Sequence, residues 1–568
     1  MAFQVSPGVE VKEIDATNVV PAVSTSIGGF AGAFNWGPTE QIVTVSSENE
    51  LAEIFGSPDD STAKHFLVAA SFLKYGNALK VVRVSSGHLN ATAQGTGQLI
   101  KNDDDYENNY RDGSLNLGNW AAKHPGVLGN SLKVSMVSAG SAFNSWPHAG
   151  NFDAAPGTSN AASAVGVSND ELHVCVIDED GAISGTAGTV LENFGFMSQA
   201  SDAKNDDGTS NFYKDVIDNQ SEYIRWIDHD TNLDEAGFTL AAAKAANTDS
   251  EGANTFKTHG SAMEASLSGG TDDNAPTTGE IAAGFDLLED SETVDVNLLF
   301  AAPDADGAEA IAEDLISIAN ARKDCMAFIS PPIADTVNTS SAAANVKAFA
   351  DGLTSTSYAS CDSSAVYVYD KYNDVFRYIP ASGHMAGLCA NTDSVADSWF
   401  SPAGVNRGQL LGVTKLAFNP KKADRDTLYK ARVNPVVSLP GQGTLLFGDK
   451  TLLSSPSAFD RINVRRLFIA LEKAISTAAK AQLFEFNDEF TRAQFRNLVE
   501  PFLRDVKGRR GLTDFQVICD TTNNTSQVID GNKFVADIFI KPTRSINFIS
   551  LNFIATRSGV EFSEIAGS

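Results

Sequence analysis

The alternation of apolar and polar residues is clearest in the C-terminal quarter of the chain, residues 458–565. It predicts two amphipathic helices, Asn463–Gln482 and Asp488–Lys507. In the second helix, apolar residues recur at the i, i+3, i+4, i+7 spacing of one buried stripe, so this helix should pack against a core. Pro501 lies inside the pattern, and we expect a kink or a break there. The stripe consists of Phe495, Leu498, Val499, Phe502, Leu503 and Val506.

Beyond Gly508 and Gly511, the apolar residues recur at every second position, which is typical of strands. Strands are expected over Phe515–Asp520, Phe534–Ile540 and Ile546–Ala555. Helices followed by strands with one apolar face predict a compact two-layer unit in this part of the chain.

The N-terminal part of the chain, from Val23 to Val84, alternates strands with helices and forms only half of an α/β domain. The other half returns as strands Val294–Phe300 and Met326–Ile329 around the helix Ala308–Arg322. This βαβ spacing predicts parallel pairing with a right-handed crossover. The expected N-terminal elements are strand Ser26–Phe34, a turn at Asn35–Pro38, strand Gln41–Val45, helices Glu48–Phe55 and Thr62–Tyr75, and strand Leu79–Val84.

Between these halves, residues 87–280 are rich in Asp, Asn, Ser, Gly and Ala. Their expected strands are short: Leu132–Val137, Leu172–Ile177 and Tyr223–Ile227. We interpret this segment as one or two inserted β-rich domains that project from an α/β body. Residues 350–400 should add a helix, a hairpin of Ala365–Tyr369 and Val375–Ile379, and a final helix near Met385.

Charge is distributed unevenly over the 568 residues, whose formal net charge is −29. Residues 401–568 carry 23 Lys and Arg against 16 Asp and Glu, a net charge of +7, which leaves −36 for residues 1–400. A basic segment joined to an acidic body indicates that the C-terminal domain faces an acidic partner. The alternative is a solvated Arg-rich helix face. DNA is a weaker candidate partner, because the molecule as a whole repels phosphate.

The five cysteines are scattered and form no CxxC pair, which indicates reduced, buried thiols in a protein that folds in a cytosol. The N-terminus lacks the charged and apolar regions of a secretory signal. The sequence has no run of 18 apolar residues, so we expect a soluble protein without membrane insertion.

Three segments have the residue types of a chemical site, and each lacks part of the required pattern. Gly443–Thr451 has the two glycines of a phosphate loop, but Asp449 displaces the lysine by one position. Asp228–Asn232 resembles the start of a calcium loop, yet Leu233 stands where glycine is needed. His384 has no Cys, Ser or Asp relay and is interpreted as a core or surface histidine. We therefore expect no catalytic residue, no metal and no cofactor.

Each end of the chain carries a short, lone strand pattern. Val9 and Val11 alternate with polar residues near the N-terminus, and Val560 and Phe562 do so near the C-terminus. Such a strand either docks on its own domain or adds to the sheet of a neighbouring subunit. The pattern alone leaves both possibilities open, and docking of the strand on its own domain is the commoner of the two.

A series of short segments occurs in a fixed order, and together they resemble the contractile tail sheath proteins of bacteriophages and related injection machines. Each motif is weak by itself, and the resemblance rests on their shared order over most of the chain apart from residues 87–265. The segments are Ser6–Ile14, Ser24–Phe34, Trp36–Pro38, Phe55-Gly56, Phe72–Val84, Leu267–Asp272, Phe285–Asp290, Val294–Pro303, Arg322–Cys325, Ser401–Gly408, Asn463–Arg466, Phe484–Glu489, Phe515–Asp520, Asn523–Thr525 and Gly531.

The resemblance implies a multidomain α/β and α+β fold. An α/β middle domain would comprise residues 21–86 and 281–400, with the β-rich outer domain or domains, 87–280, inserted between them. A two-layer α+β domain, 401–557, would line the inside of the sheath. Extended arms, 1–20 and 558–568, would exchange strands between subunits. The resemblance thus favours strand exchange over docking of each strand on its own domain. The exchanged strands would contain Val9, Val11, Ile14, Val560 and Phe562.

The resemblance also implies a function. A sheath subunit polymerises as stacked rings, usually sixfold, around an inner tail tube and contracts to drive the tube through the envelope of a target cell. The implied partners are other copies of the chain, the tube protein, and the baseplate and tail terminator proteins, with no direct contact to nucleic acid. The protein would lie in the tail of the virion after assembly in the host cytoplasm.

The basic residues of the second C-terminal helix become candidates for contact with an acidic tube: Arg492, Arg496, Arg504, Lys507, Arg509 and Arg510. Two other interpretations remain open at this point. One is a polymeric shell of another kind, such as a capsid or surface-layer protein. The other is an α/β enzyme with a decorated insertion, which the absence of a catalytic pattern in the sequence disfavours.

Overall fold

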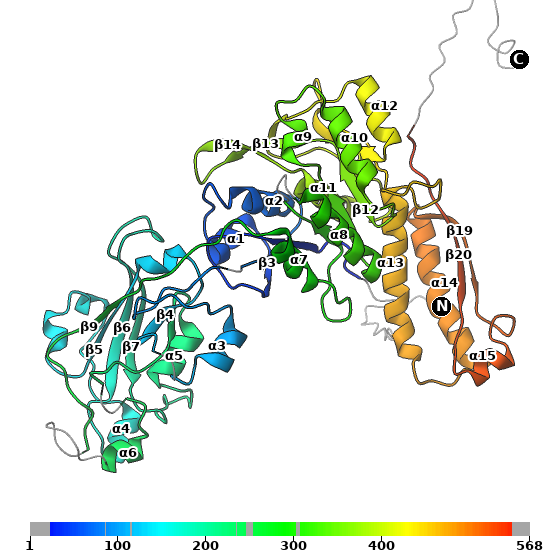
Figure 1. Ribbon diagram of the computed structural model, residues 1–568. Coiled ribbons are helices and arrows are strands. Elements are labelled where there is room, and N and C mark those ends of the chain that lie inside the picture. The colour runs from blue at the N-terminus through cyan, green and yellow to red at the C-terminus, as the bar shows by residue number, and fades with distance from the viewer. Residues whose placement is uncertain are drawn as a thin grey trace, which may run out of the picture. The chain divides into compact units, whose positions relative to one another are not determined.

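The computed structural model describes residues 23–85, 87–113, 116–233, 236–245, 254–302 and 307–547 (Figure 1). Its contacts divide the chain into two compact units. The larger unit, which we call the body, comprises Ser24–Ala396 and Pro402–Asp460. Of the described residues, the C-terminal unit takes Val23, Asp397–Ser401 and Arg461–Asn547.

The body is built on a seven-stranded sheet with the order β16-β12-β11-β10-β1-β3-β2. All neighbouring pairs are parallel except β2 with β3. The parallel pairing predicted for the strands on either side of the helix α8 (Ala308–Arg322) is confirmed. The strands are β1 (Gly28–Gly32), β2 (Ile42–Val45), β3 (Leu79–Arg83), β10 (Leu298–Phe300), β11 (Met326–Ile329), β12 (Ala359–Asp362) and β16 (Val433–Asn434).

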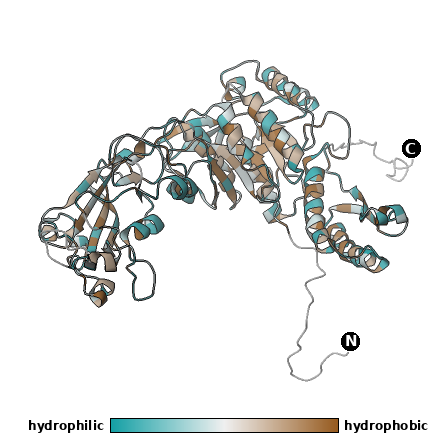
Figure 2. Cartoon of the chain, turned by 60° about the horizontal axis from the view of Figure 1, so that its bottom comes forward, coloured by the Kyte–Doolittle hydropathy of each residue, from teal (hydrophilic) through white to brown (hydrophobic). Residues whose placement is uncertain are grey.

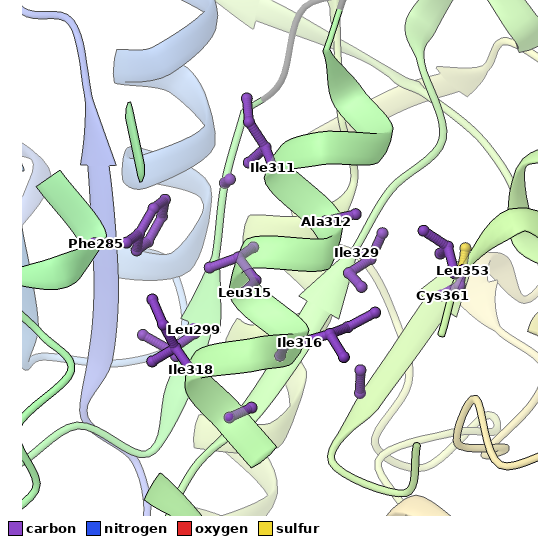
Figure 3. Close-up of a cluster of buried hydrophobic side chains, with 14 of the residues drawn as sticks. Phe285, Leu299, Ile311, Ala312, Leu315, Ile316, Ile318, Ile329, Leu353 and Cys361 are labelled. Atoms are coloured by element: carbon purple, nitrogen blue, oxygen red, sulfur yellow. The ribbon is translucent and has the colours of Figure 1, made fainter. Parts of the chain in front are cut away.

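Helices cover the sheet because successive strand residues point to opposite faces, and both faces are apolar. On one face, Phe30 and Phe72 pack against Phe300, with the Phe72 and Phe300 rings stacked at 5.3 Å. This face is covered by α2 (Ala63–Leu73) and α11 (Ser382–Val395). On the other face, Leu299 packs with side chains of α7 (Thr278–Asp286) and α8 (Figure 3).

The second face contains a large core cluster of the body. In Figure 3, Leu315 and Ile318 of α8 lie beside Leu299, and Phe285 comes from α7. The helices involved are α7 (Thr278–Asp286), α8 (Ala308–Arg322), α10 (Ala342–Gly352) and α12 (Lys422–Lys430). The remaining helices of the body outside the insertion are α1 (Glu48–Phe55) and α9 (Ile333–Thr336).

The segment Pro402–Asp460 packs with the body, so the compact C-terminal unit does not begin at the expected residue 401. The reason lies in the sheet, because β16 closes its edge by pairing Val433 with Cys361 of β12. This segment also contributes strands to two small antiparallel sheets. They consist of β13 (Val366–Asp370), β14 (Val375–Ile379) and β15 (Val413–Leu416), and of β17 (Val436–Leu439) with β18 (Gly443–Leu446).

The insertion is β-rich, as the sequence predicts. Its main sheet has the order β7-β6-β5-β9, and a two-stranded sheet pairs β4 with β8. The strands are β4 (Trp120–Ala122), β5 (Leu132–Ser138), β6 (Glu171–Asp178), β7 (Thr189–Ser198), β8 (Ile224–Trp226) and β9 (Met263–Ser266). The helices are α3 (Asp103–Asn109), α4 (Asn160–Val165), α5 (Tyr213–Gln220) and α6 (Leu240–Ala245).

The C-terminal unit is a helical hairpin packed on a β-hairpin. The helices α13 (Ile462–Ala479) and α14 (Glu489–Gly508) confirm the two amphipathic helices, with a short 3-10 turn at Lys480–Gln482. The helix α14 continues through Pro501 without a break. The strands β19 (Leu512–Ile518) and β20 (Asp537–Pro542) pair antiparallel, with α15 (Ser526–Asp530) between them. Figure 2 shows hydrophobic and hydrophilic colours on opposite sides of these helices.

All five cysteines are buried, as expected, and none of them forms a disulfide. Among the described residues, no helix is both long and apolar enough to cross a membrane. The two terminal strand patterns, with Val9, Val11, Ile14, Val560 and Phe562, lie outside the described residues.

Candidate interaction surface of the C-terminal unit

The helix α14 is fixed at its start and along one side. The Asp488 carboxylate accepts a hydrogen bond of 2.8 Å from the Thr491 backbone N–H, and this bond lowers the pKa of Asp488. The apolar stripe then packs against α13 and the β-hairpin, with Val499 and Leu503 completely buried. The orientation of the helix is therefore set by its core, and the remaining faces carry the basic residues.

Arg492 is one of the six basic candidates, and it is buried. Its Nη1 donates to the carbonyl oxygen of Asn487 at 3.1 Å and to the Asn487 side-chain oxygen at 2.7 Å. Arg492 thus holds the loop that leads into α14, and its guanidinium is not on the surface of the described unit.

Two other candidates form ion pairs close by in the chain. Arg496 lies 4.0 Å from Glu500, one helical turn away, and the Lys507 amine lies 3.1 Å from the Asp514 carboxylate on β19. The hydrogen bond from Lys507 lowers the pKa of Asp514. Because all four side chains are at least one third exposed, these pairs contribute little to stability and can exchange partners.

Arg509 fixes the segment Asp397–Ser401 to the end of α14. Its guanidinium lies 3.2 Å from the Asp397 carboxylate and 3.3 Å from that of Asp505. It also lies over the Trp399 ring, 4.8 Å from the centroid, while the Trp399 indole N–H donates to the Arg509 carbonyl at 3.1 Å. Arg509 is therefore a structural residue of this unit as well as a surface charge.

Arg504 and Arg510 are exposed, and neither forms an ion pair within the described residues. Arg510 adopts a left-handed backbone conformation, with φ of 70°, at the turn from α14 into β19. Of the six candidates, these two are exposed and form no ion pair within the described residues.

The loop between α13 and α14, together with the first turn of α14, carries a group of exposed apolar residues, which we call the aromatic tip: Leu483, Phe484, Phe486 and Phe490. Phe484 is fully exposed, Phe486 is 84% exposed and Phe490 is 75% exposed. The sequence contained this signal as a run of Phe between two helices, but without the fold it could not be distinguished from a core segment.

The β-hairpin of the C-terminal unit has two open edges among the described residues, because β19 and β20 pair only with each other. Along β20 the exposure alternates between exposed and half-buried residues. An unpaired strand edge presents backbone donors and acceptors that can bind a further strand.

The first two incomplete chemical patterns have structural roles in the body. Gly443–Leu446 forms β18, and the Lys450 amine donates to the Tyr429 carbonyl at 2.7 Å. The Asp230 carboxylate accepts from Asn119 at 3.0 Å and from the Asn232 backbone at 2.9 Å. Both segments thus use their polar groups within the fold.

His384, the third pattern, is a core residue whose Nδ1 lies 3.0 Å from the Tyr75 hydroxyl. Burial lowers the pKa of His384 to about 3, so the ring is neutral at physiological pH. A neutral ring held inside the body fits the interpretation of His384 as part of the core.

The chain thus combines an α/β body that carries a β-rich insertion with a C-terminal unit that has exposed basic and apolar residues, and comparison with known proteins identifies its family. Residues 274–452 match the phage tail sheath protein central domain, and residues 454–556 match the phage tail sheath C-terminal domain. Residues 25–84 match the N-terminal region of domain III of the tail sheath protein Gp18.

Relatives that align over the full length of the chain are also tail sheath proteins. The chain is 33% identical to the tail sheath protein of Vibrio phage KVP40 over 688 residues of alignment, which cover 99% of each chain. It is 33% identical to the tail sheath protein of Enterobacteria phage T4 over 653 residues, again with 99% of each chain covered. The chain therefore belongs to the phage tail sheath protein family.

Solved structures share the fold. A sheath tail protein from Listeria innocua gives a TM-score of 0.54 at 11% identity, covering 93% of this chain and 95% of that one. The helical sheath of the anti-feeding prophage in its contracted state gives a TM-score of 0.51 at 14% identity, covering 98% and 100%.

Proposed function

We propose that this chain polymerises into stacked rings around an inner tail tube and contracts to drive that tube through a cell envelope, without catalysis of its own. The rings would be sixfold, the β-rich insertion would face outward and the C-terminal unit would face the tube. The partners would be other copies of the chain, the tube protein, and the baseplate and tail terminator proteins. Assembly would take place in the host cytoplasm, and the assembled protein would be part of the virion.

The observation that carries this proposal is the pair of edges that the β19–β20 hairpin leaves open among the described residues. A two-stranded sheet is marginal by itself and gains backbone hydrogen bonds when strands are added. The chain has two candidate strands, one around Val9 and Val11 and one around Val560 and Phe562. If neighbouring subunits supply them, the backbone ladders link the subunits while the units rotate as rigid bodies during contraction.

Deletion of the terminal segments tests the exchange of strands. Variants that lack residues 1–16 or 558–568 should remain folded but should form no tubes, with or without added tube protein. Electron microscopy reports assembly, and circular dichroism reports folding. Tubes formed by either variant would contradict strand exchange, and the wild-type chain on the same grids is the control.

We further propose that Arg504 and Arg510 make the main contact with an acidic inner tube. Both are exposed at α14 or its end and form no ion pair within the described residues, whereas Arg496, Lys507 and Arg509 each form one. Arg492 is buried and would act by holding its loop. Charge pairs at an exposed interface are weak and screened by salt, so many of them can be broken together when the sheath contracts.

Charge reversal tests the contact with the tube. The double variant Arg504→Glu with Arg510→Glu should weaken tube-templated assembly, and the difference from wild type should shrink as salt is raised. Lys204→Glu with Lys323→Glu, at two exposed residues of the body, is a control with the same change of net charge. If tube-templated assembly of the Arg504→Glu and Arg510→Glu variant depended on salt in the same way as that of the wild type, the electrostatic contact would be contradicted.

A further inference from the structure

The aromatic tip is an exposed apolar surface on an otherwise amphipathic unit. A buried aromatic side chain contributes about 150–250 Å², so three Phe residues at these exposures present on the order of 400 Å². That is the size of the largest apolar patch on a typical monomer, and such patches mark interaction sites. Water contact with this area is unfavourable, so the tip favours a partner that covers it.

The loop is held in place by polar contacts that leave the phenylalanines outside. Asn487 donates from its side-chain amide to the Lys533 carbonyl at 2.7 Å, and Arg492 donates back to Asn487. Phe484 adopts a left-handed backbone conformation with φ of 71°, which is uncommon for a bulky residue. These hydrogen bonds and this backbone conformation hold the loop in a form that leaves its phenylalanines exposed.

The tip is also acidic, and this restricts its partner. Residues 483–490 contain Glu485, Asp488 and Glu489 and no Lys or Arg. A matching surface must combine apolar area with positive charge. The basic end of α14 has the charge but not the apolar area, because none of the large exposed apolar residues lies between Phe490 and Ile529.

The body carries a surface with both properties, which we call the basic apolar patch: Val405, Phe447, Lys421, Lys422 and Arg425. Val405 is 57% exposed and Phe447 is 50% exposed. The two lie together because the Gly404 backbone N–H donates to the Leu446 carbonyl at 2.9 Å. The Arg425 guanidinium lies 5.8 Å from the Phe447 ring centroid, and residues 402–432 hold seven Lys and Arg against two Asp.

We propose that the aromatic tip of one copy docks on the basic apolar patch of a second copy. Each copy carries one tip and one patch, so the contact joins unlike surfaces and can repeat from copy to copy. Contacts of this kind generate rings when the rotation between copies closes and helical filaments when it does not, and either can be part of a sheath of stacked rings. The inference rests on the proposed function and adds to it a specific contact that uses side chains instead of exchanged strands.

Cross-linking in assembled tubes tests the contact. The five native cysteines are buried, so an exposed pair can be labelled selectively. In the double variant Phe484→Cys with Val405→Cys, a short bismaleimide should give a ladder of covalent multimers, and neither single variant should do so. The matched control pairs Phe484→Cys with Val165→Cys, an exposed residue of the insertion, and should give no ladder.

A second experiment measures assembly without cross-linking. Phe484→Ser with Phe486→Ser should raise the concentration needed for tubes at least tenfold while the monomer keeps its helix content, because both side chains are exposed. Glu485→Lys with Glu489→Lys should have a similar effect, and Lys421→Glu with Arg425→Glu in the same chain should partly restore assembly.

Two results would overturn the inference while leaving the proposed function intact. One is that the variant Phe484→Ser with Phe486→Ser assembles like the wild type, while the variant Phe484→Cys with Val405→Cys gives no ladder of cross-linked multimers. The other is a cross-link from the single variant Phe484→Cys to added tube protein, which would assign the tip to the tube. Failure of the wild-type chain to form tubes, alone or with tube protein, would instead remove the proposed function, and the inference with it.

Discussion

The Arg509 guanidinium lies 3.2 Å from the Asp397 carboxylate, although the two residues are far apart in the sequence, and it also covers the Trp399 ring. Asp397–Ser401 thereby becomes part of the C-terminal unit although the chain on both sides of it belongs to the body. Trp399 reaches the core of that unit, where it packs with the apolar stripe of α14. The segment Asp397–Ser401 is therefore held by contacts with the C-terminal unit, while the residues before and after it belong to the body.

Removal of the anchor should loosen the C-terminal unit. Trp399→Ala deletes a buried aromatic side chain and should cost about 3–5 kcal/mol of the unit's stability. Arg509→Ala removes only a half-exposed cation and should cost less than about 1 kcal/mol. Hydrogen exchange of α14 measures both effects, and Arg504→Ala is the matched control with no expected change. Unaltered exchange in the Trp399 variant would show that the anchor is dispensable.

The buried carboxyl of Asp362 should make the stability of the body depend on pH. Asp362 ends β12, where it accepts hydrogen bonds from the Ser330 hydroxyl and the Ser364 backbone. Burial raises its pKa to about 7 in the folded protein, whereas these hydrogen bonds act in the opposite direction. A raised carboxyl pKa means that the contribution of Asp362 to stability is complete at pH below about 4 and is lost as pH rises through about 7.

The variant Asp362→Asn should remove this dependence. The free energy of unfolding of wild type relative to the variant should fall between pH 5 and pH 8, by a few kcal/mol in order of magnitude. Urea denaturation at several pH values measures the difference, and Asp426→Asn on the exposed face of α12 is the control. Parallel curves for wild type and Asp362→Asn would contradict the raised pKa.

The contact between α2 and α11 leaves no room for a side chain at Gly383. A Cβ atom there would overlap the Val68 carbonyl oxygen, which is part of a helix backbone and cannot move alone. Gly383→Ala should therefore destabilise the body by about 1–3 kcal/mol. Gly150→Ala, with no atom within 4 Å of the added Cβ, should change stability little. Thermal unfolding compares the two, and equal midpoints would contradict the close packing of these helices.

The sequence predicted the regular parts of the fold well because their patterns were strong. The bounds of α1, α8 and β11 agree with the expected ranges, since each has clear apolar periodicity or a short buried run. The helix α12 was not predicted, because only Leu428 is buried on it and no apolar stripe exists. In β7 the pattern is broken near Phe196, whose φ of 56° marks an irregular strand.

The candidate surface was predictable only in part. The sequence located the basic residues on one helix but could not show that Arg492 is buried or that Arg509 pairs with Asp397. Those outcomes depend on contacts between distant parts of the chain, which periodicity does not report. For the same reason, the end of the body at Asp460 could not be predicted from composition, since it depends on the pairing of β16 with β12.

The central claim is that this chain assembles as a hollow sheath around a tube, and electron microscopy of the purified full-length protein tests it most directly. The account predicts long striated tubes with a wide lumen, formed by the chain alone or with added tube protein inside them. Uniform small particles under both conditions would contradict the claim.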